Sequence, residues 1–579
     1  MRPVNFVLLF AAFCGVAHAA QQDAVMDAMQ AEMTRSLTLT LGQLDKPYFL
    51  SYQVDDQNTW SASATLGGLV ASNTSSFRAP RVRIRVGDYK FDNSNWTGAN
   101  ASGPRYDLRS FPLEDTNPLV MRQYLWLATD SSFKGALQSI ARKRAALRNV
   151  TVTDQLADLT PAQPFVAVHD YTPINFDEKA WAERVRTVSK VFAAYPALRS
   201  SSVDYTAIDN LHRFITNEGT QLRQQDTVGM VEIRATVQAA DGMILRDLAT
   251  FYTHDLNKMF SEDEMSKAAR AISDQVSKLA AAPMGDEYAG PVLFEGVASA
   301  QLLAELLGRN VHISRKPLSP PGAASQSTPT DLEGRRGVRI MPEFFDVVDD
   351  PTLPMFGHEE ADEEGVQDRP VTLVEKGVLK DFLRSRQPVR GYNDSNGRGR
   401  IPANFGAELP IPTNLIVKAR ETSTIAELKQ KLLDLVQQRD LPYAIIVRKM
   451  DFPSSASRDE ARKILAAAGS GRAVAAPLYV YRLYPDGHEE LVRGQRFRSM
   501  SARALKDILA AGNDSVTFNY LDNGAPFALL GFGNGAAEVS VVAPSLLIDD
   551  LEMSKVDDEQ PKLPLVPSPF ALSQTAAAK

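Results

Sequence analysis

The first twenty residues constrain the fold most, because they read as a segment that is removed together with the only cysteine. A positive residue precedes the short apolar run Phe6 to Val16, and Ala17-His18-Ala19 is a small-x-small cleavage site. We therefore expect a Sec-type signal peptide over residues 1–20, cleaved near Ala19/Ala20, and a periplasmic or secreted protein. Since Cys14 lies inside it, the mature chain must fold without a disulfide or a thiolate-bound metal.

Composition excludes several classes of protein. At 44% hydrophobic and 23% charged residues, the chain is of ordinary globular composition, and 579 residues allow more than one domain. A net charge of −7 argues against a chain-wide phosphate-binding surface, so we expect no nucleic-acid partner. No stretch after the signal approaches 18 apolar residues, so we expect no membrane insertion after cleavage.

Hydrophobic spacing predicts an N-terminal α/β region over residues 21–284. Steps of three to four residues predict helices and alternation predicts strands. The expected helices are 24–37, 117–148, one opened by Asp177 and one opened by a Ser261–Glu264 capping box; the expected strands are 81–86, 203–207 and a hairpin through Asp241-Gly242. We expect the arginines of 81–86 to face outward and the basic run 142–148 to be a solvated helix face.

A second region over residues 285–556 is dominated by short strand and turn patterns. We expect helices over 293–307, with Gly308 as a left-handed stop, and near 424–437 and 501–511. The segment 317–330 predicts a mobile loop, and 557–579 a disordered tail. The predicted fold class is α+β, with an N-terminal α/β sheet-and-helix half followed by a largely antiparallel β C-terminal half.

Common catalytic motifs are missing from the sequence. No G-x-S-x-G occurs, and the S-x-x-K match at 131–134 has no accompanying K-T-G or S-D-N. The glycine-rich run Gly531–Gly535 precedes a strand-like segment instead of a helix, which favours a hairpin over a dinucleotide site.

Metal-binding patterns are incomplete. His358 and His488 each begin an H-E sequence, but neither has a second histidine four or five residues later. Acidic residues cluster over 346–368, where oxygen ligands could hold a cation, although Asp349-Asp350-Pro351 is also an ordinary turn. His358, Asp349 and Asp350 are the alternative metal candidates.

Several ordered motifs nevertheless resemble the TldD/PmbA family, whose members are often called modulators of DNA gyrase. The motifs cover about 285–555 well and 200–285 more loosely; they are Gly290–Gly296 with Ala298, Asp349–Pro354, Glu364–Val366, Val374–Lys380, Pro412–Leu415 and Ala543–Asp549. The resemblance supports the α+β expectation.

In the TldD branch, the resemblance implies a zinc site built from H-E-x-x-x-H and a later cysteine. Here Phe294 and Ser299 occupy the two histidine positions, Glu295 is retained, and the segment Leu530–Gly535 holds no cysteine. Glu295 could act as a general base only on water already polarised by a metal. We therefore favour a structural role for Glu295, as a cap or in an ion pair.

This pattern resembles the TldE/PmbA branch, the non-catalytic partner of TldD. The resemblance implies that this chain binds no cofactor, that zinc sits in a TldD-like metalloprotease subunit, and that the substrates are peptides or unfolded proteins. The assembly would be a heterodimer with that subunit, or a homodimer. Two alternatives stay open: an active peptidase with a relocated metal site, and a peptide-binding protein that does not cleave.

Overall fold

The computed structural model describes residues 23–98, 117–148, 156–319, 330–402, 408–467, 474–498, 500–525, 528–530, 535–557, 566 and 568–571. The expected signal peptide, most of the 317–330 loop, most of the Gly531–Gly535 run and most of the 557–579 tail lie outside these ranges. None of the helices within them is both long and apolar enough to cross a membrane.

The N-terminal half is built on one six-stranded sheet in the order β2-β1-β4-β5-β3, with β6 also paired to β5. Its strands are β1 (Pro47–Thr65), β2 (Gly68–Val86), β3 (Val166–Val168), β4 (Leu198–Thr216), β5 (Gln221–Gln238) and β6 (Ile244–Thr253). Its helices are α1 (Ala24–Ser36), α2 (Pro118–Ala146), α3 (Glu178–Ser189) and α4 (Glu262–Ala281). All strand pairs are antiparallel except β3 with β5.

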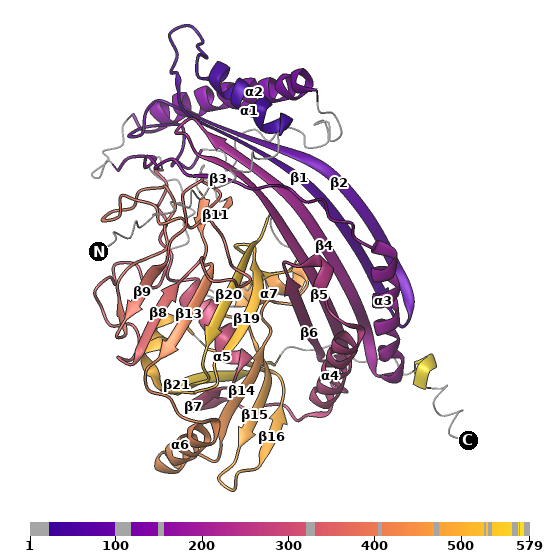
Figure 1. Ribbon diagram of the computed structural model, residues 1–579. Coiled ribbons are helices and arrows are strands. Elements are labelled where there is room, and N and C mark those ends of the chain that lie inside the picture. Colours follow the sequence, from indigo (N-terminus) through magenta and orange to yellow (C-terminus); the bar gives the residue numbers. More distant parts are fainter. Residues whose placement is uncertain are drawn as a thin grey trace, which may run out of the picture.

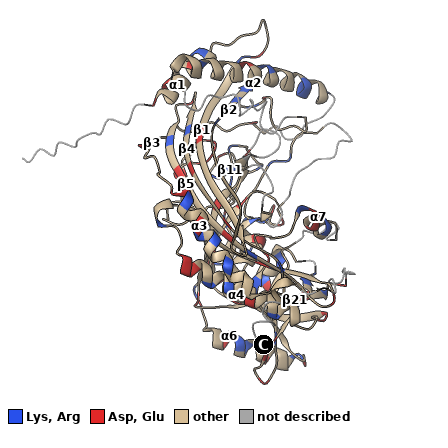
Figure 2. Cartoon of the chain, turned by 90° about the vertical axis from the view of Figure 1, so that its right-hand side faces the viewer, with Lys and Arg blue, Asp and Glu red and all other residues tan. Residues whose placement is uncertain are grey.

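The long strands form a curved arch with α1 and α2 at one end and α3 and α4 at the other (Figure 1). Met29, Leu50 and Leu125 belong to the core beneath α1 and α2, while Val185 and Val231 belong to the core beneath α3 and α4. The C-terminal sheets lie on the concave side of the arch (Figure 1). Acidic and basic residues are interspersed in the perpendicular view (Figure 2), as expected for solvated surfaces.

The C-terminal half contains two larger sheets and one small one. A seven-stranded sheet has the order β16-β15-β14-β7-β21-β17, with β18 paired to β21: β7 (Tyr288–Phe294), β14 (Ala444–Met450), β15 (Pro477–Leu483), β16 (Glu489–Val492), β17 (Gln495–Phe497), β18 (Ile508–Ala511) and β21 (Leu546–Lys555). A six-stranded sheet has the order β10-β9-β8-β13-β20-β19: β8 (Phe345–Asp349), β9 (Val371–Glu375), β10 (Val378–Leu379), β13 (Asn414–Ala419), β19 (Val516–Asp522) and β20 (Ala537–Ala543). The small sheet pairs β11 (Gly399–Pro402) with β12 (Glu408–Pro410).

Three helices accompany these sheets: α5 (Val297–Leu303), α6 (Ile425–Gln438) and α7 (Arg458–Ala467). The residues of α5 after Val297 are buried, and its apolar side chains share one core with both larger sheets. The α+β fold class with a largely antiparallel C-terminal half is confirmed, since among the described strands of that half only β7 with β14 and β13 with β20 pair in parallel.

Local sequence signals located most N-terminal elements correctly. Asp177 caps α3 through the Ala180 N–H, and Ser261 and Glu264 form the expected capping box of α4. The hairpin between β5 and β6 turns at Gly242, whose φ of +99° is in the left-handed region that favours glycine. These signals worked because each depends only on neighbours along the chain.

Two expectations about charged residues were wrong. The arginines of 81–86 do not face open solvent: Arg83 pairs with Glu408 of the C-terminal half, and Arg85 lies 2.8 Å from Asp92. The basic run of α2 is not wholly solvated either, because Lys143 is fully buried with its Nζ 2.6 Å from an oxygen of Asp158. In both places another part of the chain covers the face.

The expected helices over 293–307 and 501–511 also needed correction. The chain is still in β7 at Phe294, α5 starts at Val297, and a π-helical turn (Ala304–Gly308) follows it. Gly308 does not adopt a left-handed conformation. The 501–511 segment is a 3₁₀ turn (Ala502–Asp507) that leads into β18. Tertiary packing overrode helical spacing at both sites.

Candidate functional site

The segment that resembles a zinc motif lies where β7 ends and α5 begins. β7 is an interior strand between β14 and β21, so the turn after it is fixed on both sides. Gly296 has a φ of +53°, and its N–H donates to the Ser545 Oγ at 2.8 Å. This glycine lets the chain reverse sharply from the sheet into the buried helix.

Phe294 and Ser299 both point into the protein core. Each is fully buried. The ring of Phe294 packs against that of Phe497, with centroids 5.9 Å apart. The Ser299 hydroxyl donates to the Pro544 carbonyl at 2.6 Å. Neither position provides a metal-binding atom to an open cavity.

Glu295 lies in a network of two carboxylates and two cations. Its Oε2 lies 2.7 Å from the Arg448 Nε, and its Oε1 lies 3.2 Å from the Lys429 Nζ. Glu489 contacts the same two cations, at 2.7 Å and 2.8 Å. Burial opposes the charge of Arg448, but its contacts with the two carboxylates raise its pKa.

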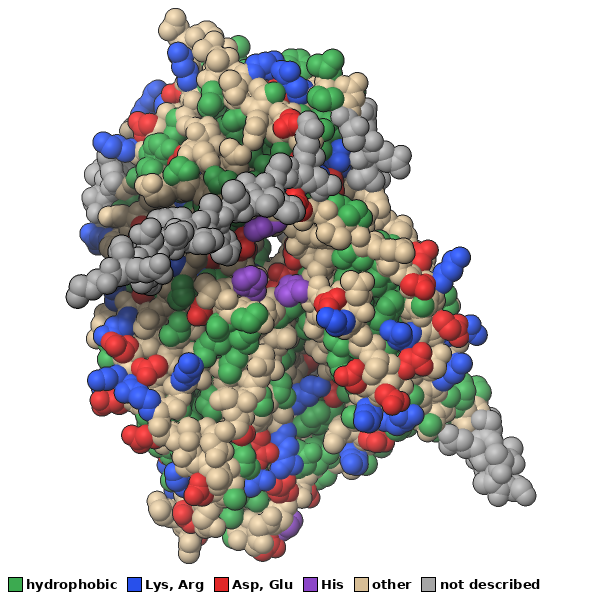
Figure 3. Space-filling view, in the orientation of Figure 1, with side chains coloured by type: hydrophobic (Ala, Val, Ile, Leu, Met, Phe, Trp, Pro, Cys, Tyr) green, Lys and Arg blue, Asp and Glu red, His purple; other side chains and the backbone are tan. Residues whose placement is uncertain are grey.

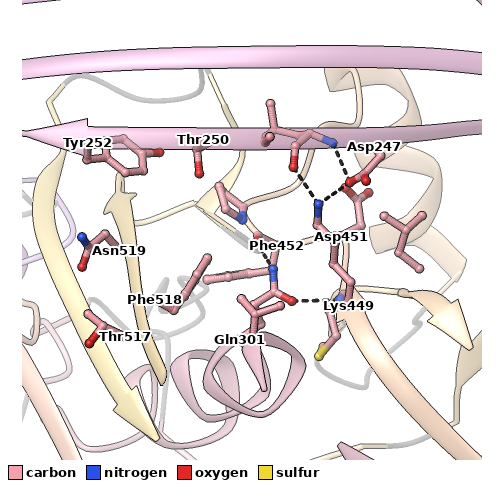
Figure 4. Close-up of a pocket in the computed structure, with 16 residues that line it drawn as sticks. Asp247, Thr250, Tyr252, Gln301, Lys449, Asp451, Phe452, Thr517, Phe518 and Asn519 are labelled. Atoms are coloured by element: carbon pink, nitrogen blue, oxygen red, sulfur yellow. Dashed lines mark hydrogen bonds and ion pairs between the residues drawn. The ribbon is translucent and has the colours of Figure 1, made fainter. Parts of the chain in front are cut away.

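A cleft of about 380 Å³ opens on another side of α5 (Figure 4). One wall comes from β6 and another from β19, strands that each end a sheet within the described residues. Residues of α5, β14 and the following turn complete the cleft. The lining residues are Asp247, Leu248, Ala249, Thr250, Tyr252, Val297, Gln301, Lys449, Met450, Asp451, Phe452, Pro453, Leu478, Thr517, Phe518 and Asn519.

A buried carboxylate at the cleft ties the two halves of the protein together. Asp247 of β6 is 2% exposed, and its two oxygens lie 2.5 Å from the Lys449 Nζ and 2.5 Å from the Tyr479 hydroxyl. Burial, followed by the negative charge of Asp247, raises the pKa of Tyr479. Lys449 also donates to the Leu248 carbonyl at 2.8 Å, so at least one backbone acceptor of the β6 edge faces this site.

Two further polar side chains define the cleft. Gln301 of α5 is fixed, since its Nε2 donates to the Phe452 carbonyl at 2.6 Å and its Oε1 accepts from the Met450 N–H at 2.8 Å. The hydroxyl of Tyr252 is buried, which raises its pKa, and the Thr250 side chain is within reach as a hydrogen-bond partner.

The alternative metal candidates do not come together. Asp349 is buried against Arg398 at 2.5 Å, and Asp350 accepts from the Thr352 hydroxyl at 2.6 Å. The His358 Nδ1 lies 2.8 Å from the Pro351 carbonyl. Across the described ranges, no group of three or more His, Cys, Asp or Glu is placed to hold a metal ion.

The rest of the acidic cluster is largely occupied by protein donors. Asp362 accepts from two backbone N–H groups at 2.9 Å, and Glu359 pairs with Arg400. Burial raises the pKa of Asp362 well above its usual range. Histidines gather around a hollow near the centre of this face (Figure 3). Elsewhere in the acidic cluster, the His169 Nε2 lies 2.8 Å from an oxygen of Glu360.

Sequence reasoning did not identify the residues of the cleft. Tyr479 lies 232 positions after Asp247, and Lys449 and Gln301 come from different elements again. Such a group has no spacing that a motif could record. The only local signal is a charged residue inside each of two strand-like runs, at Asp247 and Lys449.

Comparison with known proteins agrees with the resemblance. Residues 287–438 match the PmbA/TldA metallopeptidase C-terminal domain, a range that contains β7, the Phe294–Ser299 turn and α6. The fold is similar to that of the crystal structure of TldE from Thermococcus kodakarensis, with a TM-score of 0.56 and 12% identity over 92% of this chain and 100% of that chain. The chain therefore contains a PmbA/TldA-type C-terminal domain over residues 287–438, and its fold is similar to that of TldE.

Two curated relatives of this chain are described as metalloproteases. One, from Archaeoglobus fulgidus, is 39% identical over 82 residues, which is 14% of this chain and 19% of the relative. The other, from Methanothermobacter thermautotrophicus, is 24% identical over 195 residues, 34% of this chain and 41% of the relative. The matches therefore span less than half the length of either relative.

Proposed function

We propose that this protein is an exported TldE/PmbA-like subunit of a TldD/TldE-type metalloprotease acting on peptides or unfolded proteins. The burial of Phe294 and Ser299 carries the proposal. Catalytic zinc takes three nitrogen, sulfur or oxygen ligands and keeps one position open. A phenyl ring cannot ligate it, a single serine hydroxyl is a poor ligand, and Glu295 is held by Arg448 and Lys429. These residues do not fit zinc, so a TldD-like partner would hold the metal.

Reconstitution with the partner tests this proposal. The mature chain is expressed alone and together with a candidate subunit that carries H-E-x-x-x-H, and the mass of each species and the hydrolysis of unfolded peptides are measured. We expect a heterodimer, with hydrolysis that requires the partner and is stopped by chelator. A chain that stays monomeric or forms only a homodimer, with no effect on the partner's activity, would refute the subunit role.

Metal content separates this proposal from an active peptidase with a relocated site. Mass spectrometry of the purified mature chain, before and after chelator, is expected to find no stoichiometric zinc. Stoichiometric zinc together with chelator-sensitive peptide cleavage by the chain alone would favour the relocated site. Loss of that cleavage in His358→Ala would then locate it.

A second candidate, peptide binding without cleavage, is favoured by the cleft between β6 and β19. Free sheet edges offer main-chain donors and acceptors, and an extended peptide can add to them as a further strand. The isolated chain would then bind unfolded peptides tightly with no partner present. Weak binding that tightens only in the heterodimer would favour the subunit role instead.

Export follows from the expected signal peptide and is part of the proposal. N-terminal sequencing of the protein recovered from the periplasm or medium is expected to begin at Ala20 or Gln21. Recovery of the intact chain inside the cell would place the protein elsewhere.

A further inference from the structure

A second, larger cavity of about 630 Å³ lies between the start of β6, α4, α7 and β17. We call it the apolar groove, after the lining residues Met243, Ile244, Leu245, Ile464, Leu478 and Val556. Ile244 and Ile464 are 40% and 37% exposed, among the more exposed large apolar side chains of the protein. Two exposed isoleucines on one hollow are the feature expected where another apolar group is bound.

The groove also carries cations of two kinds. Arg246 and Arg493 are neutralised, since Arg246 lies 3.0 Å from Asp451 and Arg493 lies 2.8 Å from Asp241. By contrast, Lys463 of α7 and Arg496 of β17 form no ion pair with the described residues. Lys463 directly precedes the exposed Ile464, and both line the groove. An apolar side chain and a cation without a carboxylate partner therefore lie next to each other.

We propose that the apolar groove binds a protein segment that combines apolar side chains with carboxylates. Burying apolar groups against Ile244 and Ile464 removes hydrophobic area from water. Carboxylates of the bound segment would pair with Lys463 and Arg496, whose charges no described residue neutralises. Charge pairs at the rim of an interface contribute more to the choice of partner than to affinity.

This inference goes beyond the proposed subunit role, because it requires neither zinc nor a TldD-like partner. The groove shares Asp451 and Leu478 with the cleft at α5, but its other lining residues are different. Its failure and the failure of the subunit proposal are therefore distinguishable. Binding to the groove is measured on the chain alone, whereas the subunit role is measured by hydrolysis with the partner.

The experiment measures fluorescence anisotropy of short labelled peptides with the full mature chain. One peptide alternates leucine with glutamate, a second replaces glutamate with lysine, and a third replaces leucine with serine. We expect the leucine–glutamate peptide to bind with an affinity about five- to tenfold higher than that of either other peptide. Its affinity should fall as the salt concentration rises. Equal binding of the glutamate and lysine peptides would overturn the proposal.

Matched variants locate the binding. Lys463→Glu and Ile464→Asn are each expected to lower the affinity for the leucine–glutamate peptide about fivefold. The controls are Lys418→Glu at an exposed position of β13 and Leu509→Asn at an exposed position of β18, which alter a lysine and a large apolar residue outside the groove. Circular dichroism verifies that all four variants fold. If Lys463→Glu binds like Lys418→Glu, or Ile464→Asn like Leu509→Asn, the groove is not the site.

Discussion

The Oε2 of Glu295 lies 2.7 Å from the Nε of Arg448, and sheet register places the two residues together. β7 and β14 pair in parallel with Phe294 opposite Val447, and the Glu295 N–H donates to the Val447 carbonyl at 2.9 Å. Glu295 follows Phe294 and Arg448 follows Val447, so this register places Glu295 and Arg448 side by side. The glutamate at the position of the zinc motif is thus used in an ion pair.

We predict that Glu295→Gln lowers the free energy of unfolding by about 1–2 kcal/mol, because it leaves two partly buried cations with one fewer carboxylate. Urea denaturation measures this loss. Arg448→Gln should cost a similar amount, and the double variant should cost less than the sum because the residues are in contact. If the two single losses simply add in the double variant, the contact between Glu295 and Arg448 contributes nothing to stability.

Introducing histidines at positions 294 and 299 should not create a metal site. In the double variant Phe294→His, Ser299→His, both new side chains enter a fully buried core. We expect the free energy of unfolding to fall by about 3–5 kcal/mol, because packing against Phe497 is lost and polar atoms are buried. Zinc content should stay below stoichiometric. Stoichiometric zinc with unchanged thermal stability would contradict this reading of the site.

Stability should decrease between neutral and alkaline pH because of His212. Burial alone would lower its pKa, but the contact with Asp55 at 2.7 Å across β1 and β4 raises the pKa of His212 from 6.5 to about 9. The stabilisation is complete below pH 6.5 and is lost as the pH rises from there toward 9, because only the unfolded chain releases the proton. The loss is at most about 3 kcal/mol.

Urea unfolding at about pH 6 and about pH 9 tests this dependence. His212→Gln cannot take up the proton and should flatten the change over that interval. A variant with the same pH dependence as the natural protein would assign the effect to other groups.

Tyr252→Phe should affect peptide binding at the cleft with little effect on the stability of the fold. Its buried hydroxyl has at most the Thr250 side chain as a partner, so removing it should change the free energy of unfolding by no more than about 1 kcal/mol. If a peptide in the cleft bonds to this hydroxyl, affinity should fall about fivefold, measured by anisotropy. Thr517→Val, elsewhere on the cleft wall, is a matched control. An unchanged affinity would place the peptide away from Tyr252.

Helices and turns with local signals could be predicted from the sequence. Asp177, Ser261 and Gly242 each act on backbone groups within a few residues, so their effect survives in any tertiary context. Of the candidate site, the residue types at Phe294, Glu295 and Ser299 could be read directly. The cleft could not, because Asp247 and Lys449 approach only when the N-terminal sheet meets the C-terminal half.

The sequence by itself determined the positions of several helices and strands, the capping of α3 and α4, and the residue types at Phe294 and Ser299. These depend on residue identity and on neighbours along the chain. Only the tertiary structure decided which charges are buried. Lys143, Arg83 and Glu295 find carboxylates or cations on distant elements, and desolvation depends on what covers a side chain in space.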